Sequence, residues 1–254
     1  MTYCVGMLVR DGLVMIADTR TNAGVDNIST YRKLRVHGND GKRLIGIVSA
    51  GSLSTTQGAM HRLTAGVSNP ETGELETLDT VPNIYRAALA AGRALREARD
   101  GMVSLEQEDV NFNASLLVGG SIGGEPTRLF LVYSAGNAIE CGPDTPYLQI
   151  GENKYGKPII ERALTYETDL YEAVKIGLIS FDSTMRANLA VGLPLDLMIA
   201  RPGQGRAELV HRIDHNDAYF HDLSQRWSDA LAHARAEIPA PPYGPGPLGL
   251  VPQR

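Results

Sequence analysis

A turn signal close to the start of the chain constrains the fold more than any other feature of the sequence. The pair Asp11-Gly12 separates two runs of β-forming residues, Tyr3–Arg10 and Leu13–Ala17. Both central residues of a type I′ turn have positive φ, which Asp and Gly tolerate, so this pair between such runs predicts a β-hairpin. With the pair as the turn, Thr2 lies opposite Thr21. The chain therefore returns to its own N-terminal end.

A second turn signal predicts another hairpin a short distance along the chain. The sequence GNDG lies between the β-prone runs Lys33–His37 and Arg43–Val48. Pairing across this turn brings Lys33 back beside the segment Ser49–Gly51. The second hairpin therefore carries a lysine and a glycine backbone at its open end.

Together the two hairpins deliver four chemically useful groups to strand ends. The first hairpin places Asp18 within a few residues of Thr2 on a neighbouring strand, and the second places Lys33 near Gly51. If both hairpins join one sheet with their open ends at the same edge, the four groups converge. Thr2, Asp18, Lys33 and Gly51 are therefore the candidate catalytic residues.

The rest of the sequence predicts pairs of helices between blocks of strands. Ser/Thr starts, Gly ends and a Pro82 in the first turn mark the helices, and β-branched or apolar runs mark the strands. Two paired helices between hairpin-rich blocks favour an α+β layer fold over a parallel βαβ fold. One domain is expected over 1–238, with a Pro/Gly-rich tail over 239–254. The predicted helices cover 54–66, 81–99, 155–164, 169–189 and 220–237, and the later strands 112–120, 128–136, 146–151, 195–200 and 207–213.

Composition excludes several classes of function. The 254 residues are 43% hydrophobic, which allows a sizeable core. The net charge is −5 with acids and bases interspersed, so no nucleic-acid partner is expected. The first apolar stretch is interrupted by Arg10 and Asp11, and no apolar run reaches the ~18 residues of a membrane span, so neither a signal peptide nor a membrane partner is expected. Two distant cysteines predict no disulfide framework and a cytoplasmic location.

The chemistry of the four groups fits a nucleophile at the end of the chain. Trimming of Met1 is expected because the next residue is small, and it would give Thr2 both a hydroxyl and a free α-amine. That amine has a reference pKa of about 7.7–8.0 and can act as the base for its own hydroxyl. The Lys33 ammonium would lower the pKa of the amine by like-charge repulsion, and Asp18 would hold the lysine. The Gly51 N–H could stabilise an oxyanion.

Each of these residues also has an ordinary interpretation. Threonine after Met is common, Asp18 alone is typical of a turn or cap, and Lys33 alone is typical of a solvated surface. The interpretation depends on the four residues together. Histidines and aspartates over 211–222 lack zinc-type spacing, and the glycine-rich VGGSIGG lacks the lysine of a phosphate loop. No metal and no cofactor are therefore expected.

These residues carry a resemblance to a known family. The opening MTYCVGMLVRDGLVMIADTRTNAG, the lysine at 33 and VSAGS resemble the start of a proteasome β-type subunit. The stretches ADTRTNAGVDNISTYRKL, QIGENKYGKPI and DSTMRANLAVGLPLDL resemble Anbu, the bacterial proteasome-related family, over roughly residues 2–238. The resemblance implies a four-layer αββα sandwich of the N-terminal-nucleophile kind. It implies Thr2 as nucleophile, an Asp18–Lys33 pair and an oxyanion glycine at 51. It also implies a substrate pocket that includes Thr21, Ser49 and Leu53.

The resemblance further implies a threonine-type hydrolase of peptide or protein substrates that works in a ring or open spiral homo-oligomer. Two departures from the proteasome pattern leave alternatives open. Where proteasome subunits have an Asp and a Ser, this chain has Ala187 and Ala190 with Asn188 between them, and Gly151-Glu152 replaces Gly-Ser. The hydrogen-bond network around the amine must therefore differ. A catalytically weak or inactive assembly subunit and an amidase acting on a small amide remain as alternatives.

Overall fold

The computed structural model describes residues 2–22, 28–102 and 111–243. Contacts divide the chain into two compact units, Met1–Asp217 and Ala218–Arg254. Within its described residues, 218–243, the second unit has one helix, α5 (Ala218–Glu237). Its last residues, from 244 onward, lie outside the described residues, so the predicted tail over 239–254 and its boundary with 1–238 stay predictions.

The first unit is built on two five-stranded antiparallel sheets. We call them the first sheet and the second sheet. The first sheet has, in spatial order, β12 (Tyr147–Gly151), β1 (Tyr3–Val9), β2 (Gly12–Asp18), β13 (Leu195–Ala200) and β14 (Leu209–Ile213). The second sheet has β11 (Ala138–Glu140), β10 (Arg128–Val132), β9 (Ala114–Ile122), β6 (Arg43–Gly51) and β5 (Leu34–Gly38).

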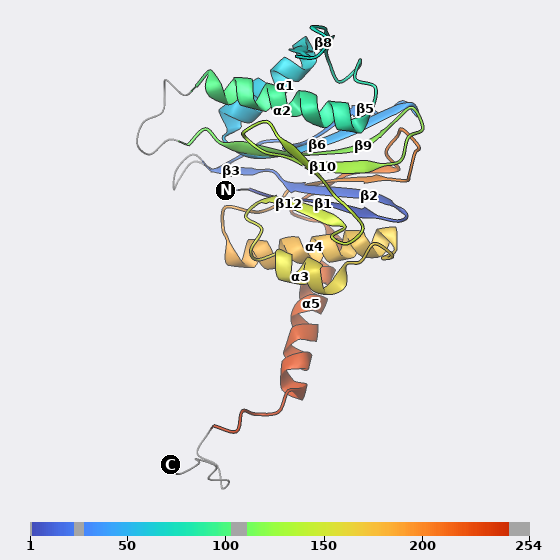
Figure 1. Ribbon diagram of the computed structural model, residues 1–254. Coiled ribbons are helices and arrows are strands. Elements are labelled where there is room, and N and C mark those ends of the chain that lie inside the picture. Colours follow the sequence, from blue (N-terminus) through green and yellow to red (C-terminus); the bar gives the residue numbers. More distant parts are fainter. Residues whose placement is uncertain (1, 23–27, 103–110, 244–254) are drawn as a thin grey trace, which may run out of the picture. The chain divides into compact units, whose positions relative to one another are not determined.

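Helices cover the outer faces of both sheets. The helices α1 (Leu53–Ala65) and α2 (Ile84–Asp100) lie on the second sheet, and α3 (Lys157–Ala163) and α4 (Leu170–Ala187) lie on the first (Figure 1). The two sheets face each other between these helix layers. The predicted α+β sandwich with helix, sheet, sheet and helix layers is confirmed. None of the described helices is long and apolar enough to cross a bilayer.

Alternate side chains of β6 pack into two different apolar clusters, one on each face of the second sheet. Ile45 and Ile47 pack toward α1 and α2, whereas Leu44 and Val48 belong to the apolar cluster between the sheets. Successive side chains of a strand point to opposite faces, so a strand buried on both faces must be apolar at consecutive positions. The run LIGIV meets that requirement. This strand ends at Gly51, which the core therefore holds in place.

The helices begin at polar caps. Ser52 accepts a hydrogen bond from the N–H of Thr55 at the start of α1, and Asn83 accepts one from the N–H of Arg86 at the start of α2. Pro82 therefore precedes α2 and does not lie in its first turn as the sequence predicted. The many alanines of α2 are buried within this chain. Their small size is used for packing inside the subunit.

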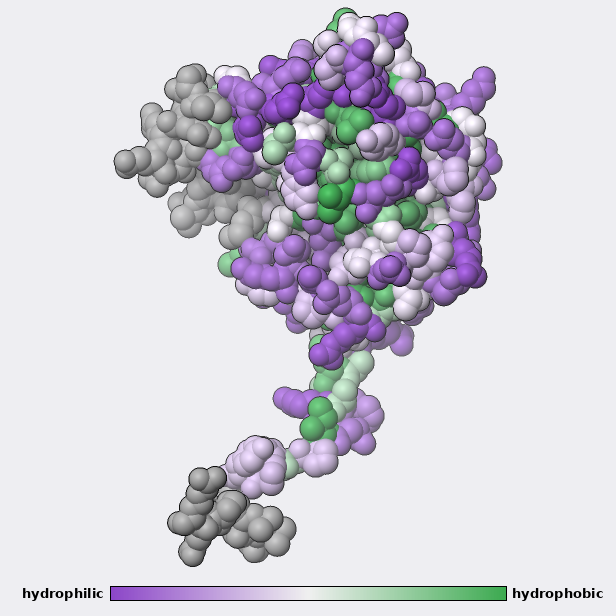
Figure 2. Space-filling view, viewed as in Figure 1, coloured by the Kyte–Doolittle hydropathy of each residue, from purple (hydrophilic) through white to green (hydrophobic). Residues whose placement is uncertain are grey.

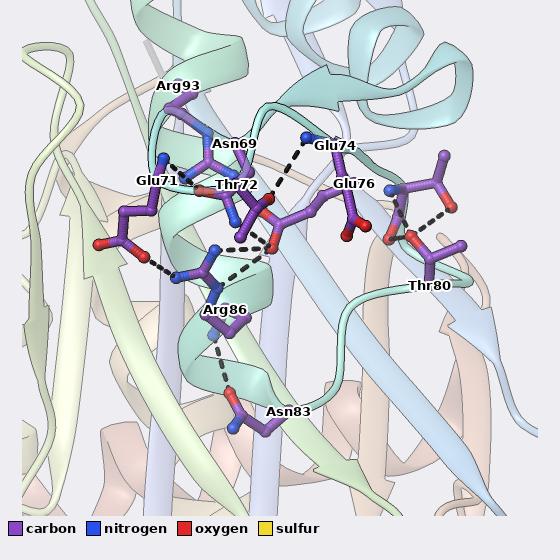
Figure 3. A network of polar contacts seen from close by, with 10 residues as sticks. Asn69, Glu71, Thr72, Glu74, Glu76, Thr80, Asn83, Arg86 and Arg93 are labelled. Atoms are coloured by element: carbon purple, nitrogen blue, oxygen red, sulfur yellow. Dashed lines mark hydrogen bonds and ion pairs between the residues drawn. The ribbon is translucent and has the colours of Figure 1, made fainter.

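A buried ionic network fastens a short hairpin to α2. The hairpin is made of β7 (Val67–Ser68) and β8 (Leu75–Glu76). The Glu76 carboxylate accepts hydrogen bonds from Arg86 Nε and Nη2, at 3.1 and 2.8 Å, and from Arg93 (Figure 3). Breaking a buried pair of this kind leaves an uncompensated charge, so each partner depends on the others. This hairpin was not predicted from the sequence.

The first hairpin has a different register from the predicted one. Strands β1 and β2 pair Cys4 with Ala17 and Val9 with Gly12, so Thr2 does not lie opposite Thr21. Gly12 is a strand residue with φ of 152°, and a Cβ there would lie 2.2 Å from the Ala200 carbonyl oxygen. The glycine is therefore required for close approach to β13, not for the turn. Because partners shift by two residues, every side chain keeps its predicted face.

The second hairpin forms where the sequence predicts it, but the two hairpins do not join one sheet. Leu34 pairs with Val48, which sets Lys33 beside Ser49 as expected. The first hairpin, β1–β2, lies in the first sheet, and the second, β5–β6, lies in the second sheet. The candidate residues therefore come together between two sheets that pack face to face. They do not line the edge of a single sheet.

Candidate active site

The ion pair between Asp18 and Lys33 lies at the centre of the site. Asp18 is the last residue of β2 and is fully buried, and the Lys33 side chain is 5% exposed. Lys33 Nζ donates to Asp18 Oδ1 at 2.8 Å and to the Arg20 carbonyl oxygen at 2.6 Å. Burial raises the pKa of the Asp18 carboxyl, while the Lys33 ammonium and two backbone N–H groups act against that rise. The predicted pair is thus formed in the structure.

Backbone hydrogen bonds connect this ion pair to the start of the chain. The Tyr3 N–H donates to Asp18 Oδ1 at 3.0 Å, which is the same oxygen that binds Lys33. The N–H of Arg20 donates to Asp18 Oδ2 at 3.1 Å. One carboxylate therefore fixes the lysine, the peptide that follows Thr2 and the chain beyond β2. The two-residue shift of register matters because it places Asp18 opposite Tyr3, so that the Asp18 carboxylate can accept the Tyr3 N–H.

Thr2 is held from the other side by the end of β12. It is 9% exposed, and its carbonyl oxygen accepts the Glu152 N–H at 2.7 Å. Tyr3 pairs with Gly151, whose φ is 82°. A Cβ at Gly151 would lie 1.9 Å from the Thr2 carbonyl oxygen, so only glycine permits this approach.

The remaining predicted catalytic residue, Gly51, ends β6. Its φ is 103°, and a Cβ there would lie 2.4 Å from the carbonyl oxygen of Asn113. A cavity of about 500 Å³ is lined by Gly51 and Ala50 of the second sheet and by Gly151 of the first sheet. The cavity therefore opens where the ends of both sheets meet beside the strand that begins after Thr2. Its other lining residues include Arg99, Asn113, Tyr133 and Ser134.

The predicted pocket residues lie in three different elements. Thr21 is in β3 (Arg20–Asn22), which pairs with β4 (Ile28–Thr30), and its hydroxyl hydrogen-bonds the Ser29 hydroxyl at 2.7 Å. Ser49 lies in β6, where its carbonyl oxygen faces the Cys4 thiol. Leu53 is the first residue of α1 and is exposed. Ser49 and Leu53 flank Gly51 in sequence, and a role in binding substrate stays a prediction for all three.

A second, larger cavity lies beside the segment that carries Lys33. It measures about 690 Å³ and is bounded by the edge strands β5 and β14. The guanidinium groups of Arg32, Arg35 and Arg212 line it, together with the buried Asp196 carboxylate. Arg212 donates to both oxygens of Asp196, at 2.8 and 2.9 Å. Arg32 is also paired with Asp196, and Arg35 adds a third guanidinium to the lining, so these four lining groups are net cationic.

One contact beside Thr2 could not be predicted from the sequence. The Glu152 carboxylate accepts a hydrogen bond from Asn188 Nδ2 at 3.0 Å, and Asn188 Oδ1 accepts the N–H of Ala190 at 3.0 Å. Asn188 is the residue at which α4 ends. The departures at these positions were visible in the sequence, but their contact requires the pairing of β1 with β12. That pairing has no local sequence signal.

Comparison with solved structures establishes the family. A mutant of Anbu from Hyphomicrobium sp. strain MC1 is 45% identical to this chain, with a TM-score of 0.85 over 94% of this chain and 99% of its own. Anbu (ancestral beta-subunit) from Yersinia bercovieri is 43% identical, with a TM-score of 0.85 over 95% and 99%. This chain belongs to the Anbu family. The chain in a solved helical assembly of the Anbu complex from Pseudomonas aeruginosa is 39% identical to this one, with a TM-score of 0.84 over 96% of this chain and 100% of its own.

The Anbu resemblance seen in the sequence is therefore confirmed, together with its fold. No protein-family model and no curated protein matches the chain. Among residues 2–22, 28–102 and 111–243, no group of three or more His, Cys, Asp or Glu side chains is placed to hold a metal ion.

Proposed function

We propose that this Anbu-family chain is a threonine-type N-terminal-nucleophile hydrolase of peptide bonds. One observation carries the proposal, which is the buried Asp18–Lys33 pair bonded to the peptide that follows Thr2. A buried ion pair lowers stability unless its hydrogen-bonding groups are satisfied. Here three hydrogen bonds of the pair fix the first residue of β1 and the residues that follow β2. An ammonium held beside a strand end is suited to lowering the pKa of a neighbouring α-amine.

The reaction begins with Thr2 after Met1 has been removed. The α-amine takes the hydroxyl proton through a water, and Oγ1 attacks the carbonyl carbon of the substrate. The Gly51 N–H stabilises the resulting oxyanion. The C–N bond then breaks, the leaving amine takes the proton from the α-amine, and an ester of Thr2 remains. Water then attacks that ester and gives a proton to the α-amine, the bond between Oγ1 and the acyl carbon breaks to release the carboxylic acid product, and the α-amine returns the proton to Oγ1.

The substrate class and setting follow from the same features. The proposed substrates are peptide or protein chains that bind at the cavity beside Gly51, and Thr21, Ser49 and Leu53 are the proposed contacts of the substrate. Both cysteines described, Cys4 and Cys141, are free and buried. We place the activity in the cytoplasm, where such thiols stay reduced.

A mass measurement tests the hydrolase proposal. The chain that begins at Thr2 is treated with a peptide epoxyketone, and its intact mass is recorded. We expect the mass to increase by that of the whole reagent, because the hydroxyl adds to the ketone and the amine opens the epoxide. Thr2→Ala should keep its circular dichroism spectrum and gain no mass. A trimmed wild-type chain that stays unlabelled after prolonged exposure contradicts the proposal.

An assembly subunit without robust turnover is the second candidate function. The observation that favours it is the replacement of two polar residues of the proteasome pattern by Ala187 and Ala190 beside the site. Hydrolysis of fluorogenic peptides by the trimmed chain distinguishes the candidates. Turnover that Thr2→Ala abolishes favours the hydrolase, and labelling without turnover favours an assembly subunit with a residual nucleophile.

Self-association is also part of the proposal. The solved helical assembly of the Anbu complex from Pseudomonas aeruginosa supports it. On the visible face of the first unit, polar side chains surround smaller apolar areas (Figure 2), and α5 has exposed apolar side chains at Tyr219 and Leu231. We propose these exposed apolar side chains as candidate contacts between copies of the chain.

We expect light scattering at micromolar concentration to give a mass several times the 27.4 kDa of one chain. Thr2→Ala serves as the control, because a change in the nucleophile should leave assembly unchanged. A mass equal to that of a single chain throughout the concentration range contradicts self-association into a ring or spiral.

A further inference from the structure

Glu152 is a nearly buried acid directly opposite the proposed nucleophile. Its backbone N–H donates to the Thr2 carbonyl oxygen at 2.7 Å, and its side chain is only 11% exposed. The carboxylate accepts a hydrogen bond from Asn188 Nδ2 at 3.0 Å and lies 3.3 Å from Lys154 Nζ. A charged side chain this close to a strand end is fixed by both its backbone and its head group.

Asn188 in turn is fixed by the loop that follows α4. Its backbone N–H donates to the Thr184 carbonyl oxygen, and its side-chain oxygen accepts the N–H of Ala190. Arg20 Nη1 donates to the Leu189 carbonyl oxygen at 2.6 Å. The loop is thus tied to the chain that follows Asp18. Glu152 and the Asp18–Lys33 pair therefore approach the Thr2–Tyr3 peptide from two sides.

We propose that Glu152, held by Asn188, is a positioning residue that orients the α-amine of trimmed Thr2. This inference rests on the proposed function. The flanking residues Ala187 and Ala190 have no polar side-chain group to offer the amine. Glu152 supplies a hydrogen-bond acceptor opposite the residue that bears the amine, and Asn188 keeps that acceptor from swinging into solvent. With the amine N–H directed at the carboxylate, its lone pair can face the hydroxyl.

The proposal predicts a change in the pH dependence of the reaction. A carboxylate stabilises the ammonium form of the amine and raises its pKa, whereas Lys33 lowers it. Removing the charge of Glu152 should therefore lower the pKa of the amine, so that the neutral base persists to lower pH. The charged groups near this end of β1 are those of Lys33, Asp18, Arg20 and Lys154 and, in the last two turns of α4, the Asp182–Arg186 pair.

The test is the rate of epoxyketone labelling of the trimmed chain between pH 5.5 and 9, measured by intact mass. Glu152→Gln keeps an acceptor but removes the charge, and we expect the acid-side midpoint to fall by about 0.5–1 pH unit. Asn188→Ala keeps the charge but releases the carboxylate, so we expect a lower plateau rate without a fall in the midpoint. Glu167→Gln is the matched control, because Glu167 is paired with Arg10 at the opposite end of β1.

A Glu152→Gln midpoint equal to that of Glu167→Gln would overturn the proposal, whatever the plateau rate. A second measurement separates this result from failure of the hydrolase proposal. Competitive acetylation of the Thr2 α-amine, read from the mass of the N-terminal peptide, gives the pKa of the amine without any hydrolase chemistry. If the trimmed wild-type chain does not label but Glu152→Gln still lowers the pKa of the α-amine, the hydrolase proposal fails while the positioning role of Glu152 is supported. If neither midpoint nor pKa moves, Glu152 is merely structural.

Discussion

A chain that retains an uncleaved N-terminal tag is expected to be inert toward an epoxyketone, and removal of the tag to leave Thr2 first is expected to restore full labelling. With any residue attached, the Thr2 nitrogen is a peptide amide whose lone pair is delocalised into the carbonyl, so it cannot act as a base. The expected contrast is between no added mass and one full equivalent of reagent. No other change to the chain is expected to have a larger effect.

Intact mass spectrometry measures both forms under identical conditions. Thr2→Ser, made on the trimmed chain, is the matched control, because it keeps the hydroxyl and the amine and should still label. Thr2→Ala should not. Peptide hydrolysis by the tagged chain at the rate of the trimmed chain would rule out the N-terminal mechanism, because the tagged chain has no free α-amine at Thr2.

The second large effect is expected for Lys33→Ala, which should lower the labelling rate of Thr2 by about 10²-fold or more. Without the ammonium, the pKa of the α-amine rises and less of it is neutral at pH 7. Asp18 would also lose the partner that opposes the rise of its pKa, and an unpaired buried charge costs roughly 3–5 kcal/mol. A loss of labelling in this variant alone could therefore reflect lost stability.

A double variant separates the two causes. Lys33→Met with Asp18→Asn removes both charges, keeps a side-chain acceptor for the N–H of Tyr3, and preserves volume at the lysine position. Urea unfolding should give a stability closer to that of wild type than Lys33→Ala does, while labelling should remain lost. Undiminished labelling of either variant at pH 7 contradicts the role assigned to Lys33.

The sequence predicts the outline of this site because much of it is local. The second hairpin has a self-contained turn, so the position of Lys33 beside Ser49 could be read from residues close in sequence. The register of the first hairpin could not, because the requirement for Gly12 comes from Ala200 on another strand. Whether the hairpins share a sheet is likewise decided by packing between layers, which local patterns do not encode.

Contacts between segments distant in sequence account for the parts of the site that were not predicted. Glu152 and Asn188 belong to segments that are distant from Thr2 in sequence, and neither has a motif that marks it. Short strands such as β3, β4, β7 and β8 have too few residues for alternation to be detected. The family resemblance supplied the catalytic set, but it pointed to departures at 152 and 188 without saying that the two residues touch.

The peptide unit between Thr2 and Tyr3 is bonded at both ends, its C=O to the Glu152 N–H and its N–H to Asp18. Chain termini ordinarily fray, and ordering a frayed end when substrate arrives would subtract from the free energy of binding. Here the loss of conformational entropy occurs once, during folding. The end created by removal of Met1 would therefore be rigid before any substrate is present, and a reactive group at a chain terminus would behave like one built into the middle of a strand.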